Sequence, residues 1–187
     1  MDVTAWIAAE LDDTVGRLTA QVFDVVPAER LHERPGGGNS ILWGAFHTAR
    51  HADLATAALS GADTVLAGAI GATFDERATD AGGGVDEAEQ PWSAALDPGS
   101  VRRYLDAVLT TARTTVAGLG AAGLEQVPAT AEALRRAGVP ADRFDWLYRM
   151  WSDRPAAFLV RWPIIGHLAN HTGEMIATRN RMGLSPF

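Results

Sequence analysis

Apolar residues recur at steps of three and four along most of the chain, which is the spacing of a helix with one buried face. The pattern predicts four long helices, over about residues 3–25, 41–59 and 99–119 and within 156–182. The alternation of apolar and polar residues that is typical of a strand does not occur, and neither does an internal repeat. The sequence therefore predicts an all-α protein built as a four-helix bundle.

Capping and breaking residues support these boundaries. Ser40 is a good N-cap for the second helix, and Gly61 follows its last turn. Pro98 opens the third helix, which we expect to end in the glycine-rich stretch 118–123. Pro163 falls near the start of the last helix or at a kink in it, and Gly183 stops that helix.

The connections between the helices are of unequal length. Residues 61–97 are rich in Gly, Ala and Asp and predict a long excursion with short helical pieces. A connection of that length allows the third helix to run parallel to the second. One or two further short helices are expected within 129–153, on either side of Gly138 to Pro140. The whole chain, residues 1–187, is expected to form one domain.

The composition excludes several partners. A net charge of −7 argues against nucleic acid, because binding phosphates requires a basic face. No apolar run approaches the ~20 residues that cross a bilayer, and no signal peptide is evident, so we expect no membrane contact and a cytoplasmic location.

The chain contains no cysteine and no lysine. It therefore lacks a thiolate nucleophile, a cysteine-ligated zinc, a disulfide and a Schiff-base lysine.

Four histidines form two pairs at helical spacing, His47 with His51 and His167 with His171. Residues i and i+4 of a helix point within about 40° of each other, so each pair can present two imidazoles on one side. Both pairs lie on apolar faces, where a single histidine is usually a hydrogen-bonded core residue. Three imidazoles from facing helices can instead satisfy one another through a metal. We expect His167 and His171 to bind it with His47, whose flanks are more apolar than those of His51.

Other metal sites fit the sequence less well. A zincin would need glutamate directly after the first histidine, and Leu168 stands there. A ferritin-like di-iron site would need two Glu-x-x-His motifs, and the chain has one, ending at His32. Three neutral imidazoles suit Zn²⁺ or Ni²⁺ and leave an open coordination position, as in catalytic sites.

The histidine segments resemble the DinB superfamily, which includes the mycothiol- and bacillithiol-dependent S-transferases. The resemblance rests on a W-x-x-x-H-x-x-R-x-x-D stretch in the second helix and an H-x-x-x-H motif in the last, matched here by Trp43, His47, Arg50, Asp53, His167 and His171. It implies an up-down-down-up bundle, a metal held by three histidines including His47, and often a homodimer. His51 departs from the family pattern and is either a fourth ligand or a residue beside the ligands.

The resemblance also implies a reaction. Relatives use the metal to activate the thiol of mycothiol or bacillithiol, which then adds to a small electrophile. A metal-dependent S-transferase or isomerase is therefore the leading hypothesis. Two alternatives remain: a metal-dependent hydrolase that uses a metal-bound water, and a non-catalytic metal-binding stress-response protein.

Two charged residues are candidates for catalytic roles. Arg50 lies one turn beyond His47 and could bind a carboxylate of the cofactor or substrate, or could pair with Asp53. Glu174, one turn past His171, could orient a ligand, or could be solvated surface. Arg179 and Arg181 are explained by the negative end of the last helix.

Three tryptophans, Trp146, Trp151 and Trp162, crowd the segment that leads into the last helix. They either pack the core or wall a substrate pocket at the mouth of the bundle.

Overall fold

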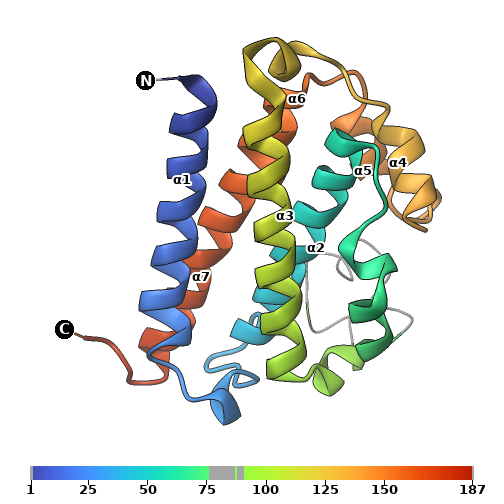
Figure 1. The fold of residues 1–187 in the computed structure, drawn as a ribbon. Coiled ribbons are helices and arrows are strands. Elements are labelled where there is room, and N and C mark those ends of the chain that lie inside the picture. The colour runs from blue at the N-terminus through green and yellow to red at the C-terminus, as the bar shows by residue number, and fades with distance from the viewer. Residues whose placement is uncertain (1, 76–86, 88–90, 187) are drawn as a thin grey trace.

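The computed structural model describes residues 2–75, 87 and 91–186 (Figure 1). The described part of the chain is helical throughout and contains no strand, so the all-α prediction is confirmed. No helix in it is both long and apolar enough to cross a membrane.

Four long helices form the bundle, as predicted: α1 (Val3–Leu18), α2 (Ile41–Ser60), α3 (Pro98–Glu125) and α7 (His167–Arg181). A π-helical turn extends α1 to Phe23. Three short helices join α3 to α7: α4 (Thr130–Arg136), α5 (Asp145–Trp151) and α6 (Ala156–Leu159). Two of them fall within 129–153, where short helices were expected.

The helices have the up-down-down-up order that the family resemblance implies. In Figure 1, α1 and α7 run in one direction, and α2 and α3 run in the other. The long connection after α2 makes this possible, because it returns the chain to the end of the bundle where α2 began. Within it the structure describes short 3₁₀ turns at Val65–Ala67, Ala69–Thr73 and Pro91–Ala95, while 76–86 and 88–90 lie outside the described residues.

The end of α3 differs from the prediction. The helix does not stop at the first glycines but continues to Glu125 across a break at Gly120, whose φ is 62° and ψ 176°. Glycine reaches this conformation without steric cost, so a single residue can interrupt the helix and let it resume. The extra turn buries Leu124, and the burial of this apolar side chain stabilises the continuation of the helix.

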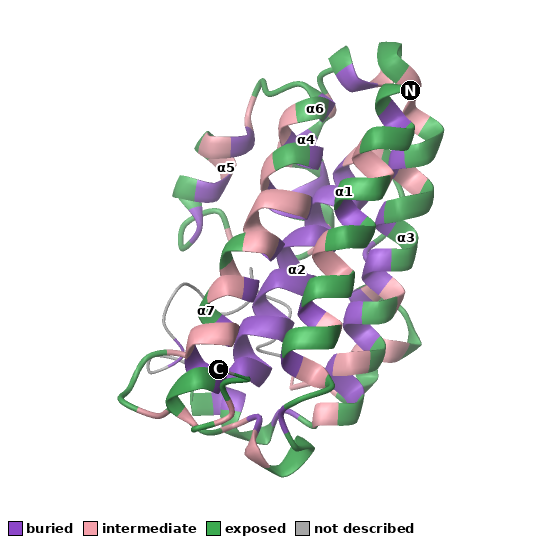
Figure 2. Ribbon diagram, turned by 90° about the vertical axis from the view of Figure 1, so that its left-hand side faces the viewer, coloured by how far each residue is buried: buried purple, intermediate pink, exposed green. Residues whose placement is uncertain are grey.

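Helix α2 lies at the centre of the bundle. Every residue from Ile41 to Ala58 is buried, and Figure 2 shows this helix in purple between partly exposed neighbours. Ser40 caps its start by accepting a hydrogen bond from the Trp43 amide at 3.1 Å, and Gly61 ends it in the left-handed conformation. A helix buried on all sides must be covered on all sides, which fixes the arrangement of the other elements around it.

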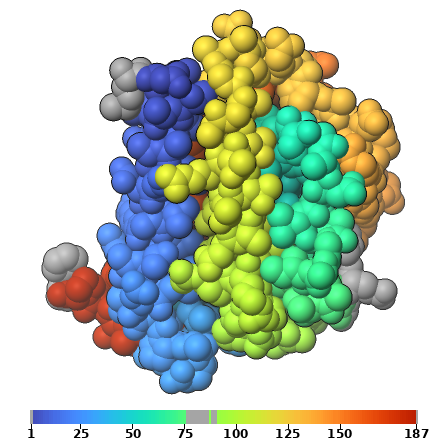
Figure 3. Space-filling model, viewed as in Figure 1, coloured from blue at the N-terminus to red at the C-terminus, as the bar shows by residue number. Residues whose placement is uncertain are grey.

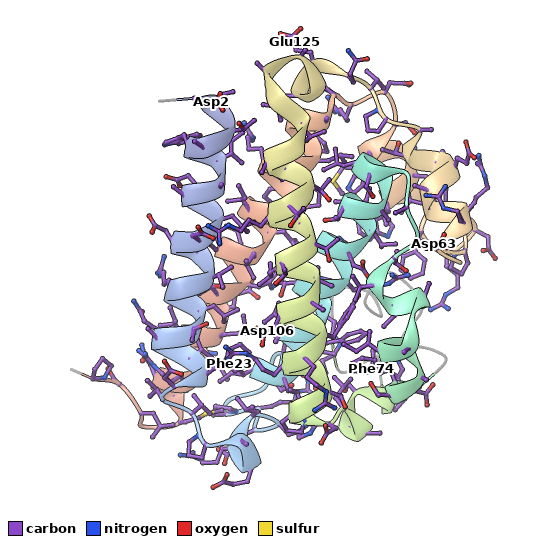
Figure 4. All side chains as sticks on the ribbon, viewed as in Figure 1. Asp2, Phe23, Asp63, Phe74, Asp106 and Glu125 are labelled. Carbon is purple, nitrogen blue, oxygen red and sulfur yellow. The ribbon has the colours of Figure 1, made fainter. Side chains whose placement is uncertain are left out.

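Several segments cover α2. In the space-filling view, α1, α3 and the connection that follows α2 occupy most of one face (Figure 3). Phe74, labelled in Figure 4, belongs to that connection, and its ring centroid lies 5.2 Å from Phe46 and 5.6 Å from Tyr104. These aromatic contacts hold the connection against α2 and α3.

Asp53 of α2 ties the same connection down through hydrogen bonds. Its buried carboxylate accepts from the amides of Val65 and Leu66 at 2.8 and 3.0 Å and from the Tyr104 hydroxyl at 2.8 Å. The Arg50 guanidinium lies 3.7 Å away. Burial raises the pKa of Asp53 above its ordinary value, while these donors and Arg50 act to lower it. The carboxylate is therefore a buried structural group with a full set of partners.

We expect Asp53→Ala to lower the free energy of unfolding by about 3–5 kcal/mol, because it leaves Arg50, Tyr104 and two amides without their acceptor. Asp106→Ala is the matched control, since Asp106 forms an exposed ion pair with Arg102 at 3.1 Å. The control should cost no more than about 0.5 kcal/mol. Urea denaturation of both variants measures the difference, and equal losses would contradict the structural role of Asp53.

Candidate metal centre

The structure brings the two predicted histidine pairs together where α2 faces α7. The ring centroid of His47 lies 4.9 Å from those of His167 and His171. The ring of His51 lies 4.4 Å from that of His167. The fifth histidine, His32, lies outside this cluster, and its Nε2 donates to the Leu96 carbonyl at 2.9 Å.

Three of the four imidazoles can present nitrogens within 4.8 Å of one another: His47, His51 and His167. His171 lies beside this group, with its Nε2 3.2 Å from that of His167. The geometry therefore joins all four histidines in one cluster, and the predicted set of His47, His167 and His171 stays a prediction. The two histidines of α2 are buried, whereas those of α7 are half-buried, so the cluster is reached from the α7 side.

Contacts with α2 hold His47 in place. The Trp43 ring, one turn earlier, stacks on the imidazole with centroids 4.5 Å apart and planes 11° apart. Gly44 has no side chain where α7 approaches, and a Cβ atom there would lie 3.3 Å from Met175 Cγ. The small residue allows the close approach of the two helices that the histidine cluster needs.

The segment before α7 sets the position of His167. Residues Val160–Gly166 form a π-helix that contains Pro163, which cannot donate a backbone hydrogen bond. A Cβ atom on Gly166 would lie 2.9 Å from the Arg161 carbonyl oxygen and 3.2 Å from Trp162 Cε3. The pattern of apolar and capping residues does not indicate a role for Gly166. Its signal is a glycine one turn after a helical proline, directly before the first histidine.

Glu174 orients His171. The Nδ1 atom of His171 donates to a carboxylate oxygen of Glu174 at 2.7 Å, and a carboxylate can only accept. The lone pair of the neutral ring is then on Nε2, which faces Nε2 of His167 at 3.2 Å. Two nitrogens bound to one tetrahedral zinc lie roughly 3.3 Å apart, so this pair already has the spacing of two ligands. The carboxylate–histidine contact is the usual support of a ligating imidazole.

The electrostatics of the site favour the neutral forms of His51 and His167. Burial lowers the pKa of His51 well below its ordinary value, and the neighbouring histidines and Arg50 lower it further. Burial and His171 lower the pKa of His167 to about 3. Neutral imidazole is the form that binds metals.

Among the described residues, Nε2 of His51 and Nδ1 of His167 are buried without a hydrogen-bond partner, as is the indole Nε1 of Trp43 beside them. Buried polar atoms rarely stay unsatisfied without a reason. Converging neutral imidazoles with unsatisfied nitrogens fit a divalent metal such as Zn²⁺ or Ni²⁺.

Arg50 lies close to the site but is only 1% exposed. Its guanidinium donates to the Ala137 carbonyl at 3.2 Å and lies 3.7 Å from the Asp53 carboxylate. The pairing with Asp53 is one of the two interpretations that the sequence allowed. These contacts attach the end of α4 to α2. A role in catalysis or in binding a cofactor stays a prediction.

The three tryptophans are placed differently from one another. Trp151 is buried in the core, whereas Trp146 is 37% exposed and Trp162 is half-buried. The Trp146 ring lies 6.4 Å from His51, and the Trp162 ring lies 6.2 Å from His167. The core interpretation is therefore confirmed for Trp151, whereas Trp146 and Trp162 lie beside the histidines, and the substrate pocket stays a prediction.

We expect Gly166→Ala to destabilise the protein by about 1–3 kcal/mol, because the added methyl group meets a backbone carbonyl that cannot easily move. Gly173→Ala, on the same side of the bundle within α7, is the control. A Cβ atom at Gly173 meets nothing within 4 Å, so alanine should stabilise the helix by about 0.5–1 kcal/mol. Thermal unfolding compares the two variants, and opposite signs are expected.

The stability of the metal-free protein should fall as the pH drops from about 6.5 toward 3. The unfolded chain binds a proton at His167 near pH 6.5, whereas the folded chain does so only near pH 3. In His167→Gln the free energy of unfolding should therefore depend less steeply on pH, by up to about 1.4 kcal/mol per pH unit within this window. Urea denaturation at several pH values in the presence of a chelator measures both slopes. Parallel slopes would show that His167 does not titrate in this way.

Comparison with known proteins agrees with the geometry of the site. The sequence model of the DinB superfamily matches residues 11–175, which include all four long helices in whole or in part and all four clustered histidines. No curated protein and no solved structure matches the chain significantly. The match covers most of the sequence, and the chain therefore belongs to the DinB superfamily.

Proposed function

We propose that the protein is a metal-dependent S-transferase or isomerase that activates a low-molecular-weight thiol, mycothiol or bacillithiol, for addition to a small electrophile. The observation that carries the proposal is the convergence of neutral imidazoles from α2 and α7 on one point with one partly exposed side. The sequence contains no cysteine, so any sulfur nucleophile must come from a small molecule.

The ligands in this proposal are His47, His167 and His171, with His51 beside them. A divalent metal bound there would lower the pKa of a thiol, so that its sulfur is a nucleophile at neutral pH. The low pKa of His167 keeps that ligand available without competition from protons. Burial of His47 under the Trp43 ring excludes water from the inner side of the site.

Reactants would approach from the side of His171. This imidazole is 17% exposed, and its partner Glu174 is 63% exposed, so the edge of the cluster meets solvent there. Glu174 keeps the proton of His171 on Nδ1 and so holds Nε2 toward the site. It is a positioning residue in this proposal.

Trp146 and Trp162 would form the apolar border of the site, where an electrophile can pack. We assign Arg50 a positioning role, because its side chain is buried and bonded to the Ala137 carbonyl. By holding the end of α4 against α2, it helps to place the segment that carries Trp146.

The reaction balances without a further reactant. When the sulfur adds to an activated double bond, one C–S bond forms and the proton of the thiol moves to the neighbouring carbon. When the electrophile carries a leaving group, that group departs with its electron pair and the proton goes to solvent.

The test begins with the metal content of the purified protein and its histidine variants. We expect about one equivalent of Zn²⁺ or Ni²⁺ in the wild type and loss of metal in His47→Ala and His171→Ala. His51→Ala should retain the metal, as should His32→Ala, the control outside the cluster. Loss of metal in His51→Ala with retention in His171→Ala would show that the ligands are His47, His51 and His167 instead.

The metal-loaded protein is then incubated with mycothiol or bacillithiol and a panel of unsaturated acids and aryl halides. We expect thiol consumption that disappears on chelation and in His171→Ala, and that persists in His32→Ala. Turnover of esters or amides without thiol would point to a hydrolase instead. A metal-loaded protein that accelerates none of these reactions would leave the non-catalytic metal-binding interpretation.

A further inference from the structure

A pocket of about 420 Å³ opens beside the histidine cluster, between the start of α2 and the second half of α7. His171 and Glu174 form its wall nearest the cluster, and Gly44 and Ala177 keep its floor free of large side chains. Its size is within the range of pockets that hold a whole small molecule. A pocket of similar size at the far end of α2 is lined by none of the histidines, so it has no comparable link to the site.

The end of the pocket away from the cluster carries a positive charge. Arg181 lines it and is exposed, and within the described part of the chain it makes no hydrogen bond or ion pair. Its neighbour Arg179 is different, because it is buried and donates to the Gln21 carbonyl at 2.6 Å. The helix dipole explains both arginines equally, but only Arg181 is left with its hydrogen-bonding groups unused at the rim of a cavity.

A glycine turn shapes the same rim. Gly36, Gly37 and Gly38 have φ values of 77°, 81° and 81°, a conformation that other residues rarely adopt. A Cβ atom on Gly36 would lie 4.0 Å from Arg181 Cδ, so this turn runs beside the arginine. With no side chains on the turn, the guanidinium can be reached from the pocket.

The start of α2 does not itself provide an anion site. The Ser40 amide and hydroxyl both donate to the buried Glu87 carboxylate, and the Ser40 hydroxyl oxygen accepts from the Trp43 amide. The chain's own carboxylate therefore already occupies the amide end of this helix. The charge that remains available to a ligand in the pocket is that of Arg181.

The distance between the two ends of the pocket determines how long a ligand must be to reach both. His171 and Arg181 are ten residues apart on α7, which corresponds to about 15 Å along the helix axis. Glu174 and Arg181 are seven residues apart, close to two full turns, and so share one face. A molecule that reaches both ends must be elongated, with a reactive group at one end and an anionic group at the other.

We propose that this pocket binds the thiol substrate and selects an elongated thiol that carries a carboxylate or phosphate away from its sulfur, which Arg181 recognises. The inference rests on the proposed function, since it places the sulfur at the histidine cluster, and of the two thiols named there it selects bacillithiol, which carries carboxylates, over mycothiol, which carries none. An anionic group near the guanidinium gains a charge-assisted hydrogen bond, whereas a ligand carboxylate or phosphate placed beside Glu174 would meet a like charge. The pocket thus fixes the orientation of the ligand as well as its class.

Glutathione and its diethyl ester are suitable probes, because they share one skeleton and differ in their carboxylates. Binding to the cobalt-substituted protein is followed by the sulfur-to-cobalt absorption band, which does not depend on turnover. We expect glutathione to bind about tenfold more tightly than the ester, as for one charge-assisted hydrogen bond. Arg181→Gln should remove the difference, and Arg17→Gln, an exposed arginine of α1 outside the pocket, should keep it.

A second variant and a second ligand complete the test. Ala177→Leu narrows the pocket and should weaken both probes by a similar factor. S-methylglutathione, which cannot provide a thiolate, measures the pocket alone by calorimetry and should lose affinity only in Arg181→Gln and Ala177→Leu. Equal binding of glutathione and its ester, or equal losses in Arg181→Gln and Arg17→Gln, would overturn the pocket proposal. If no thiol produces the absorption band while S-methylglutathione still depends on Arg181, the proposed thiol chemistry fails and the anion pocket stands.

Discussion

The complete burial of α2 is the constraint on which the rest of the structure depends. A helix with no exposed face must be enclosed by its neighbours, which here are α3, α7, α4, the Val160–Gly166 segment and the connection that follows α2. The up-down-down-up order and the long connection both contribute to this enclosure. Burial also means that each polar side chain of α2 must find its partners inside the protein. The fold therefore cannot carry His47, His51, Arg50 and Asp53 on this helix unless the neighbouring elements bring matching groups.

The two polar sets of α2 meet this demand in different ways. The carboxylate of Asp53 is saturated by two backbone amides, the Tyr104 hydroxyl and the charge of Arg50, and these bonds attach the connection to the bundle. The histidine set faces α7, where the available groups are other imidazoles with the same needs. Four neutral imidazoles offer four donors and four acceptors, and because His171 donates to Glu174, only three donors remain for four acceptor nitrogens. The first set has its partners within the fold, and the second has nitrogens that a metal ion could satisfy.

Most of the bundle was predictable, because Ser40, Gly61 and Pro98 mark helix ends by local rules that the tertiary structure does not override. The continuation of α3 past Gly120 was not, since it depends on the burial of Leu124 in a contact between distant segments. The proximity of the two histidine pairs followed from helical spacing and the family motif. The part played by His51 did not, because the distance between its ring and that of His167 depends on how closely Gly44 lets α7 approach. The requirement for glycine at position 166 was not predictable either, because it arises from the wider turn of the π-helix, which the apolar periodicity does not show.

The position of the cluster relative to solvent connects stability with function. Burial penalises the charged forms of His51 and His167, which removes protons as competitors for their nitrogens, and the Nε2 atoms of His167 and His171 lie 3.2 Å apart. Such an arrangement is unfavourable for the protein alone, and any ion that binds it lowers the free energy of the folded state relative to the unfolded chain. In the proposed function small molecules would approach such an ion past His171, which is partly exposed and lines a pocket. One helix pair would thus set the metal affinity, the metal-dependent part of the folding stability and, in the proposed function, the direction from which reactants arrive.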